Sequence, residues 1–142
     1  MINPIQVNTG VYRGPSPQTQ DDWAVLQKLG IKYTLDLQTG AQLMGDGSPL
    51  WEQLAAELYD IKAYCHPLGE FLPPTNLELR DALTCIRRNQ PIYVHCKYGR
   101  DRTGMVIARW RMANGWDRQH AIDEMYSMGM HWWFKLLWTW RL

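Results

Sequence analysis

The chain has 142 residues, of which 46% are hydrophobic and 20% charged, and its formal net charge is +1. This composition is typical of one globular domain, 1–142, and gives no reason to expect nucleic acid or a membrane surface as partner. The amino-terminal stretch MINPIQVNTG lacks a signal-peptide pattern, and no window is apolar enough to span a bilayer. The three cysteines (Cys65, Cys85 and Cys96) fit no zinc spacing. We therefore expect reduced thiols, no metal and a cytoplasmic location.

The first half of the chain alternates β-type runs with helical patterns. A strand is predicted over 11–14, followed by a helix that Ser16 or Thr19 caps and Gly30 ends. The alternating stretch IKYTLDL predicts a strand over 31–37, and a loop over 39–49 follows it. A helix over about 50–59 and a strand over 61–64 complete this half.

The second half begins with a loop over 65–74, which two prolines close. We expect Asn76 to cap a helix over 77–89, and the almost uninterrupted apolar run over 91–95 to form the most buried strand. Helices are then predicted over 103–113, from the cap Asp117 to about 128, and over 131–142. In the last of these, Trp133, Leu137 and Trp140 share a face, and we expect this helix to pack on the sheet. The alternative is an interfacial anchor or a partner-binding helix.

Strands that alternate with helices indicate an α/β fold. We expect a central, mostly parallel sheet of four to five strands, flanked by helices, with a signature loop between the buried strand and the helix after it. Ligands of such sheets bind beyond the carboxyl ends of the strands. His95 and Cys96 lie at that position.

The run HCKYGRDRTG, residues 95–104, carries the chemistry. The residues between Cys96 and Arg102 can curl so that their N–H groups surround an anion, and Gly99 gives the backbone freedom for that curl. The helix amino terminus adds positive charge, and Arg102 can bind two phosphate oxygens. We expect the same field to stabilise a Cys96 thiolate, a nucleophile for phosphoryl transfer.

This run resembles the signature loop of the cysteine-dependent protein tyrosine and dual-specificity phosphatases. The resemblance to the small atypical dual-specificity phosphatases extends over about 11–128, through VYRGPSP, GEFLPPTNLELRDAL and ARWRMANGWDRQHAIDEM. It implies hydrolysis of phosphate monoesters through a cysteinyl-phosphate intermediate, without cofactor or metal. It also implies that Cys96 is the nucleophile, Arg102 the phosphate clamp and Thr103 the hydrogen-bond partner of the sulfur, and that His95 shapes the loop and tunes the cysteine.

Two carboxylates compete for the role of general acid. Glu70 stands in the loop before the helix over 77–89, where the family commonly has an aspartate, and it is the first choice. Asp101 lies inside the signature, as in some phosphoinositide phosphatases, and has a structural alternative as a charge at a helix amino terminus.

The loop is expected to bind phosphate, sulfate or vanadate through Lys97, Tyr98, Gly99, Arg100, Asp101 and Arg102. Phosphotyrosine, phosphoserine and phosphothreonine proteins are the first substrate hypothesis. The cations Lys97, Arg100 and Arg102 also suit an inositol phosphate or phosphoinositide. A non-catalytic phosphate-binding module and an arsenate reductase or sulfur transferase are further alternatives. We expect a monomer, with Arg13 and the turn 14–17 at the rim of the site.

Overall fold

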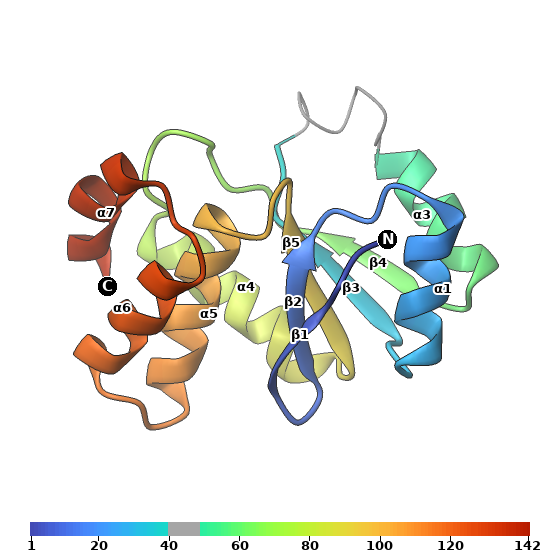
Figure 1. Ribbon diagram of the computed structural model, residues 1–142, viewed down its shortest axis with the longest axis horizontal. Helices are drawn as coiled ribbons and strands as arrows, with labels where there is room; N and C mark the ends of the chain where they lie inside the picture. Colours follow the sequence, from blue (N-terminus) through green and yellow to red (C-terminus); the bar gives the residue numbers. More distant parts are fainter. Residues whose placement is uncertain (40–48) are drawn as a thin grey trace.

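The computed structural model describes residues 1–39 and 49–142, and the strands among them form one sheet (Figure 1). The strand order is β1-β2-β5-β3-β4. β1 pairs antiparallel with β2, and the other neighbours are parallel. This confirms the predicted mostly parallel sheet. The strands are β1 (Ile5–Asn8), β2 (Val11–Pro15), β3 (Tyr33–Asp36), β4 (Lys62–Cys65) and β5 (Ile92–Cys96).

The edge strand β1 has no counterpart in the sequence prediction. Its four residues, IQVN, are half polar, and only Val7 is buried. Its apolar and polar residues alternate, but a run of only four residues is too short for this pattern to identify a strand. The four predicted strands all occur, each within a few residues of its expected bounds.

Helices cover both faces of the sheet (Figure 1). α1 (Gln20–Lys28) and α3 (Pro49–Leu58) lie on one face. The other side holds α4 (Asn76–Arg88), α5 (Asp101–Ala113), α6 (Arg118–Ser127), α7 (Trp132–Trp138) and the 3₁₀ turn η1 (Thr139–Arg141). No helix in the described ranges has the length and apolarity that crossing a membrane requires.

The helix caps correct one prediction and decide another. Thr19, one of the two expected caps, accepts a hydrogen bond from the Asp22 backbone N–H at 3.2 Å and begins α1. Asn76 does not cap α4. Thr75 does, because the sequence TNLE forms a capping box. The Thr75 hydroxyl accepts a hydrogen bond from the Glu78 backbone N–H, and the Glu78 carboxylate accepts one from the Thr75 backbone N–H.

Two further segments differ from their predicted bounds or fall outside the description. α5 begins at Asp101, two residues before the expected start. The predicted loop over 39–49 falls mainly on 40–48, outside the described residues.

Two apolar clusters hold the layers together. On the α1 and α3 side the cluster contains Trp23, Leu26, Ile31, Ala56, Ile61 and Tyr93. The larger cluster joins the opposite side of the sheet to α4, α5 and α6, and Leu35, Val94, Met105 and Val106 are fully buried in it. β5 runs between both clusters, with all five residues buried. The strand that ends at Cys96 is therefore fixed on both faces.

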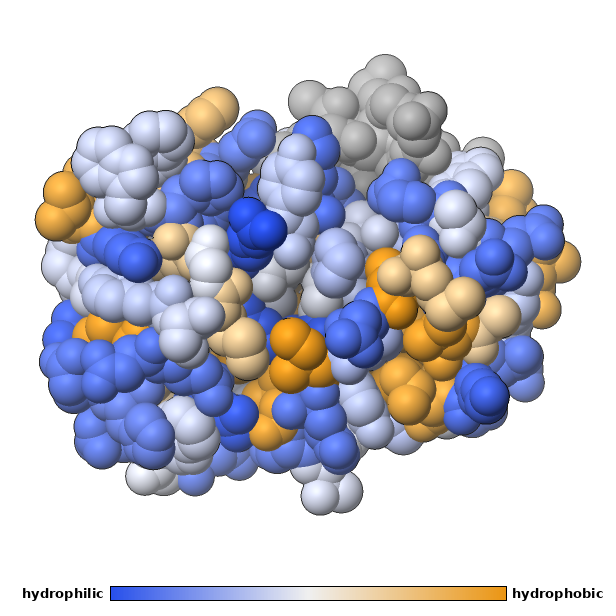
Figure 2. Space-filling model, in the orientation of Figure 1, coloured by the Kyte–Doolittle hydropathy of each residue, from blue (hydrophilic) through white to orange (hydrophobic). Residues whose placement is uncertain are grey.

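The carboxyl-terminal helix does not pack on the sheet, where it was predicted. Phe134 and Trp138 are buried, whereas Trp133, Leu137 and Trp140 are each about half or more exposed. α7 lies beyond α5 and α6, away from the sheet (Figure 1), so it meets those helices and a loop instead of a flat sheet surface. In Figure 2 this edge of the molecule, on the left, carries pale and orange side chains among the blue ones.

Candidate active site

The signature loop connects the end of β5 to the start of α5 over 97–100. Cys96 ends the strand and is 3% exposed, and Arg102 in the first turn of α5 is 5% exposed. Gly99 has φ +70°, and a Cβ there would lie 2.3 Å from the carbonyl carbon of Gly14. Both the backbone conformation and the close approach to β2 require glycine at this position. The loop thus curls tightly over a buried thiol.

β2 and the turn after it hold the carbonyl groups of the loop. The Ser16 N–H donates to the Lys97 carbonyl at 3.3 Å, and Nη2 of Arg13 donates to the Gly99 carbonyl at 3.0 Å. In a trans peptide the N–H points opposite to the C=O. The N–H groups of Tyr98 and Arg100 therefore point away from β2, as an anion cradle requires.

Arg13 does not lie at the rim of the site, where it was expected. It is 2% exposed and sits beneath the loop, because its strand runs beside β5 in parallel register. Burial lowers the pKa of its guanidinium, and the charges of Glu124 and Cys96 act in the opposite sense. Arg13 is thus a buried cation whose charge interacts with Cys96.

A cavity of about 230 Å³ opens at the carboxyl end of β5. It brings together five predicted site residues: Cys96, Lys97, Tyr98, Asp101 and Arg102. Glu70, from the loop before α4, lines it as well. The remaining walls are formed by Phe71, His131, Trp133 and Phe134. The predicted nucleophile, the predicted phosphate clamp and the first-choice acid therefore face one space, although 26 positions separate Glu70 from Cys96.

Asp101 and Glu70 differ in their surroundings. One oxygen of Asp101 accepts the His131 backbone N–H at 2.8 Å, and the other lies 2.8 Å from Nδ1 of the same residue. Both oxygens are thus occupied in fastening the start of α7 to the start of α5. Glu70 is exposed at the cavity edge. This geometry favours Glu70 as the proton donor and a structural role for Asp101.

Gly99, Arg100 and Thr103 do not line the cavity. The Arg100 side chain lies against Gly129, with its Cδ 3.4 Å from where a Cβ would stand. The Thr103 side chain is fully buried, and its Oγ1 has no hydrogen-bond partner within 1–39 and 49–142. A free hydroxyl one residue after the clamp is available to the sulfur, but its bond to Cys96 stays a prediction.

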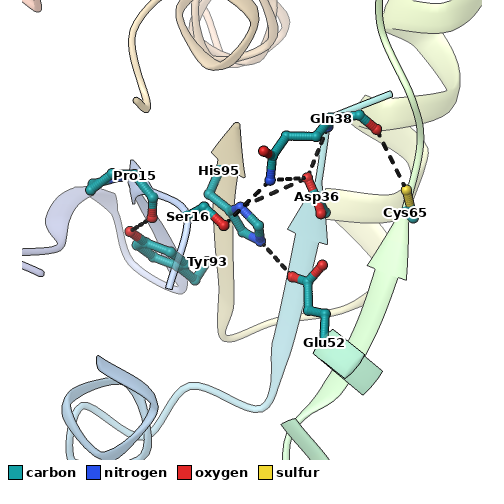
Figure 3. Close-up of polar contacts among 8 residues, drawn as sticks. All are labelled: Pro15, Ser16, Asp36, Gln38, Glu52, Cys65, Tyr93 and His95. Carbon is teal, nitrogen blue, oxygen red and sulfur yellow. Dashed lines mark hydrogen bonds and ion pairs between the residues drawn. The ribbon is translucent and has the colours of Figure 1, made fainter. Parts of the chain in front are cut away.

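A buried ionic cluster lies next to Cys96 in sequence, on the α1 and α3 side of β5 (Figure 3). Nε2 of His95 is 2.8 Å from Oε1 of Glu52, and Nδ1 is 3.8 Å from Oδ1 of Asp36. Burial would lower the pKa of His95, but Asp36 and Glu52 together raise it to about 9. Burial raises the pKa of Asp36 to about 7. Burial also acts to raise the pKa of Glu52, yet the charge and hydrogen bond of His95 bring it below the usual range.

The sequence analysis did not identify Glu52, or Trp133 and Phe134 of α7 as cavity-lining residues. Glu52 belongs to no recognisable motif, because its partner His95 lies 43 positions away in the chain. The tryptophans near the end of the chain were a visible signal, but helical periodicity did not show that Trp133 and Phe134 would reach the cavity. Nε1 of Trp138 also donates to the Phe71 carbonyl at 3.1 Å and so ties α7 to the loop that carries Glu70.

A model of the tyrosine phosphatase family matches residues 1–131. The dual specificity protein phosphatase TpbA of Pseudomonas aeruginosa is 28% identical over 130 residues, which are 90% of this chain and 55% of TpbA. The inositol diphosphatase DSP3 of Arabidopsis thaliana is 26% identical over 133 residues, 89% of this chain and 62% of DSP3. The chain thus spans little more than half the length of these relatives.

Among solved structures, the core catalytic domain of the PP-IP phosphatase SIW14 from S. cerevisiae, in complex with citrate, is similar to this chain with a TM-score of 0.76 and 24% identity. The similarity covers 94% of this chain and 81% of that one. It supports the same α/β fold.

Proposed function

Because the chain belongs to the tyrosine phosphatase family, we propose that it hydrolyses phosphate monoesters through a cysteinyl-phosphate intermediate. One observation carries the proposal: Cys96, Arg102 and Glu70 face a single cavity at the end of a buried strand. A structural cysteine near a surface arginine would not place a buried thiol, a buried guanidinium and a carboxylate around the same cavity.

In the first step, the Cys96 thiolate attacks phosphorus, and the bond between phosphorus and the leaving oxygen breaks. Arg102 and the loop N–H groups bind the equatorial oxygens, on which charge is spread in the transition state. Glu70, in its protonated form, gives its proton to the leaving oxygen and becomes a carboxylate. The products are the free alcohol or phenol and phosphocysteine.

In the second step, the Glu70 carboxylate takes a proton from water as the water oxygen attacks phosphorus. The bond between sulfur and phosphorus breaks, and the electron pair returns to sulfur as a thiolate. We assign to Thr103 a hydrogen bond to that leaving sulfur, since its buried Oγ1 has no partner elsewhere in the described chain. Inorganic phosphate leaves, and both catalytic groups regain their starting states.

Phosphotyrosine, phosphoserine and phosphothreonine proteins are the first substrate class. The walls Phe71, Tyr98, Trp133 and Phe134 are aromatic, which suits a phenyl ring above the phosphate site. An inositol phosphate or phosphoinositide is the second candidate. Lys97 at the cavity supports it, as does the naming of relatives such as DSP3 as inositol diphosphatases.

All the proposed catalytic groups come from one chain, so a monomer suffices for this reaction. The mechanism needs Cys96 as a free thiol, and the three cysteines are unpaired. A reducing compartment such as the cytoplasm maintains that state.

The test is phosphate release by the wild-type protein and Cys96→Ser over one panel of phosphopeptides, phosphoinositides and inositol polyphosphates. We expect turnover that disappears in Cys96→Ser and that vanadate inhibits in the wild type. The most rapidly hydrolysed class identifies the substrate. Vanadate binding without turnover of any compound would contradict the enzyme proposal and would indicate a non-catalytic phosphate-binding module.

A further inference from the structure

The cluster of His95, Glu52 and Asp36 is closed to solvent and rich in charge. His95 and Asp36 are 0% exposed and Glu52 is 7% exposed, and one side-chain atom from each lies within 4.8 Å of the other two. Three ionisable side chains are buried together only where their charges and hydrogen bonds compensate one another. The protonation state of the cluster is therefore constrained by its geometry.

The hydrogen bonds indicate where the protons lie. Oδ1 of Asp36 accepts from the Gln38 backbone N–H at 2.8 Å and from Nε2 of Gln38 at 3.1 Å. Oδ2 of Asp36 is buried and has no N–H or O–H donor within the described residues, and the Asp36 and Glu52 carboxyls lie within hydrogen-bonding reach of each other. Two carboxylates can bond only if one holds a proton. A proton shared by Asp36 and Glu52 satisfies both.

With that proton in place, the cluster balances only if His95 is an imidazolium. Asp36 is then neutral, Glu52 carries one negative charge, and the short contact between Glu52 and Nε2 of His95 pairs it with one positive charge. A neutral His95 would leave the Glu52 charge buried without compensation, which costs several kcal/mol.

Other titratable groups lie around this cluster. Cys96 follows His95 on β5, Tyr93 stacks on the His95 ring with centroids 5.7 Å apart, and Cys65 on β4 interacts with both carboxyls. Arg13 on β2 lies on the opposite face of the sheet, where its charge interacts with Cys96. Burial raises the pKa of Tyr93 and raises that of Cys65 to about 12, so neither ionises near neutral pH. His95, Glu52 and Asp36 therefore determine how the local charge varies with pH.

We propose that Glu52 is a positioning residue that keeps His95 protonated behind Cys96, while Asp36 holds the second proton of the cluster. The proposal rests on Cys96 being the nucleophile of the proposed function. His95 and Cys96 are consecutive in β5, so their side chains point to opposite faces and the imidazolium acts across the strand. Together with Arg13, it places buried positive charge on two sides of the thiolate.

Glu52→Gln tests this role because it removes the charge and keeps the side-chain shape. The readout is the rate at which iodoacetamide alkylates Cys96 between pH 4.5 and 8, followed by peptide mass spectrometry. Cys65 and Cys85 react slowly in this range because burial raises the pKa of each thiol. In Glu52→Gln we expect the midpoint to rise by roughly one pH unit, and the rate below it to fall about tenfold.

Two variants serve as controls. Glu57→Gln makes the same change at an exposed position of α3 and is expected to keep the wild-type profile. Asp36→Asn reproduces a protonated carboxyl, with an amide N–H that can donate to Glu52, and is expected not to raise the midpoint. An unshifted midpoint in folded Glu52→Gln would overturn the proposal, as would equal shifts in Glu52→Gln and Glu57→Gln.

A second measurement applies if Glu52→Gln does not fold. NMR of the wild-type imidazole nitrogens is expected to report a doubly protonated His95 at pH 7, and a neutral ring would contradict the proposal. Zinc found in the purified protein at one equivalent would also contradict it, by replacing the shared proton. Alkylation reports the Cys96 thiolate even where no phosphate is released, so failure of the proposed function and failure of this proposal give different results.

Discussion

The buried histidine makes stability depend on pH in a direction that the structure determines. The pKa of His95 is about 9 in the folded protein, against 6.5 as its ordinary value. Folded protein therefore keeps a proton that the unfolded chain loses between these two values. At about 1.4 kcal/mol per pH unit, this difference corresponds to about 3 kcal/mol, present below pH 6.5 and lost as pH rises through 9.

The other two groups of the cluster act at lower pH. Asp36, with its pKa raised to about 7 by burial, also stabilises the fold less as pH rises, from about pH 4 to 7. The lowered pKa of Glu52 acts in the opposite sense, and its contribution is lost on acidification. The window from pH 6.5 to 9 therefore reports mainly His95 once the Cys96 thiol is removed, as in Cys96→Ser.

Urea unfolding of Cys96→Ser at intervals across this window measures the effect, because the serine removes the thiol that the fold also acts on. We expect the free energy of unfolding to fall by about 3 kcal/mol, with an unchanged dependence on urea concentration. Adding His95→Gln, which places an amide near Glu52, should remove most of this slope. A free energy of Cys96→Ser that stays constant from pH 6.5 to 9 would refute the assignment of an imidazolium at His95.

Three further predictions concern the loop, the acid and the last helix. Gly99→Ala is expected to lower the free energy of unfolding by about 1–3 kcal/mol and to abolish vanadate binding, since its Cβ meets the Gly14 backbone; calorimetry with vanadate checks both, and normal binding would contradict the loop geometry. Glu70→Gln should reduce kcat about 10²–10⁴-fold on an alkyl phosphate but much less on p-nitrophenyl phosphate, whose leaving group needs no proton. Equal losses on the two substrates would argue against Glu70 as the acid. Trp138→Ala is expected to cost about 3–5 kcal/mol in urea unfolding, because its ring is fully buried, whereas Trp140→Ala, at an exposed ring, should cost under about 1 kcal/mol.

Local sequence patterns determined the elements and the centre of the site. The apolar run over 91–95, followed by a thiol, a glycine and Arg-Thr-Gly, specifies a strand, a tight loop and a helix start over 91–104. A strand, a tight loop and a helix start each depend on residues that are close together in the chain. The structure has β5, the curled loop and α5 at the predicted positions. The cap of α4 was misplaced by one residue, because Asn76 and Thr75 both suit the position and only the contact with Glu78 decides between them.

Only the tertiary structure decided what surrounds this centre. The parallel pairing of β2 with β5 buried Arg13 beneath the loop, against the expectation of a rim residue. Packing of Phe134 and Trp138 turned the other face of α7 to solvent and brought His131 onto Asp101. Glu52 met His95 because α3 covers that end of the sheet. Each contact joins residues far apart in the chain. Burial and charge compensation in three dimensions select the partners, and neither leaves a periodic pattern in the sequence.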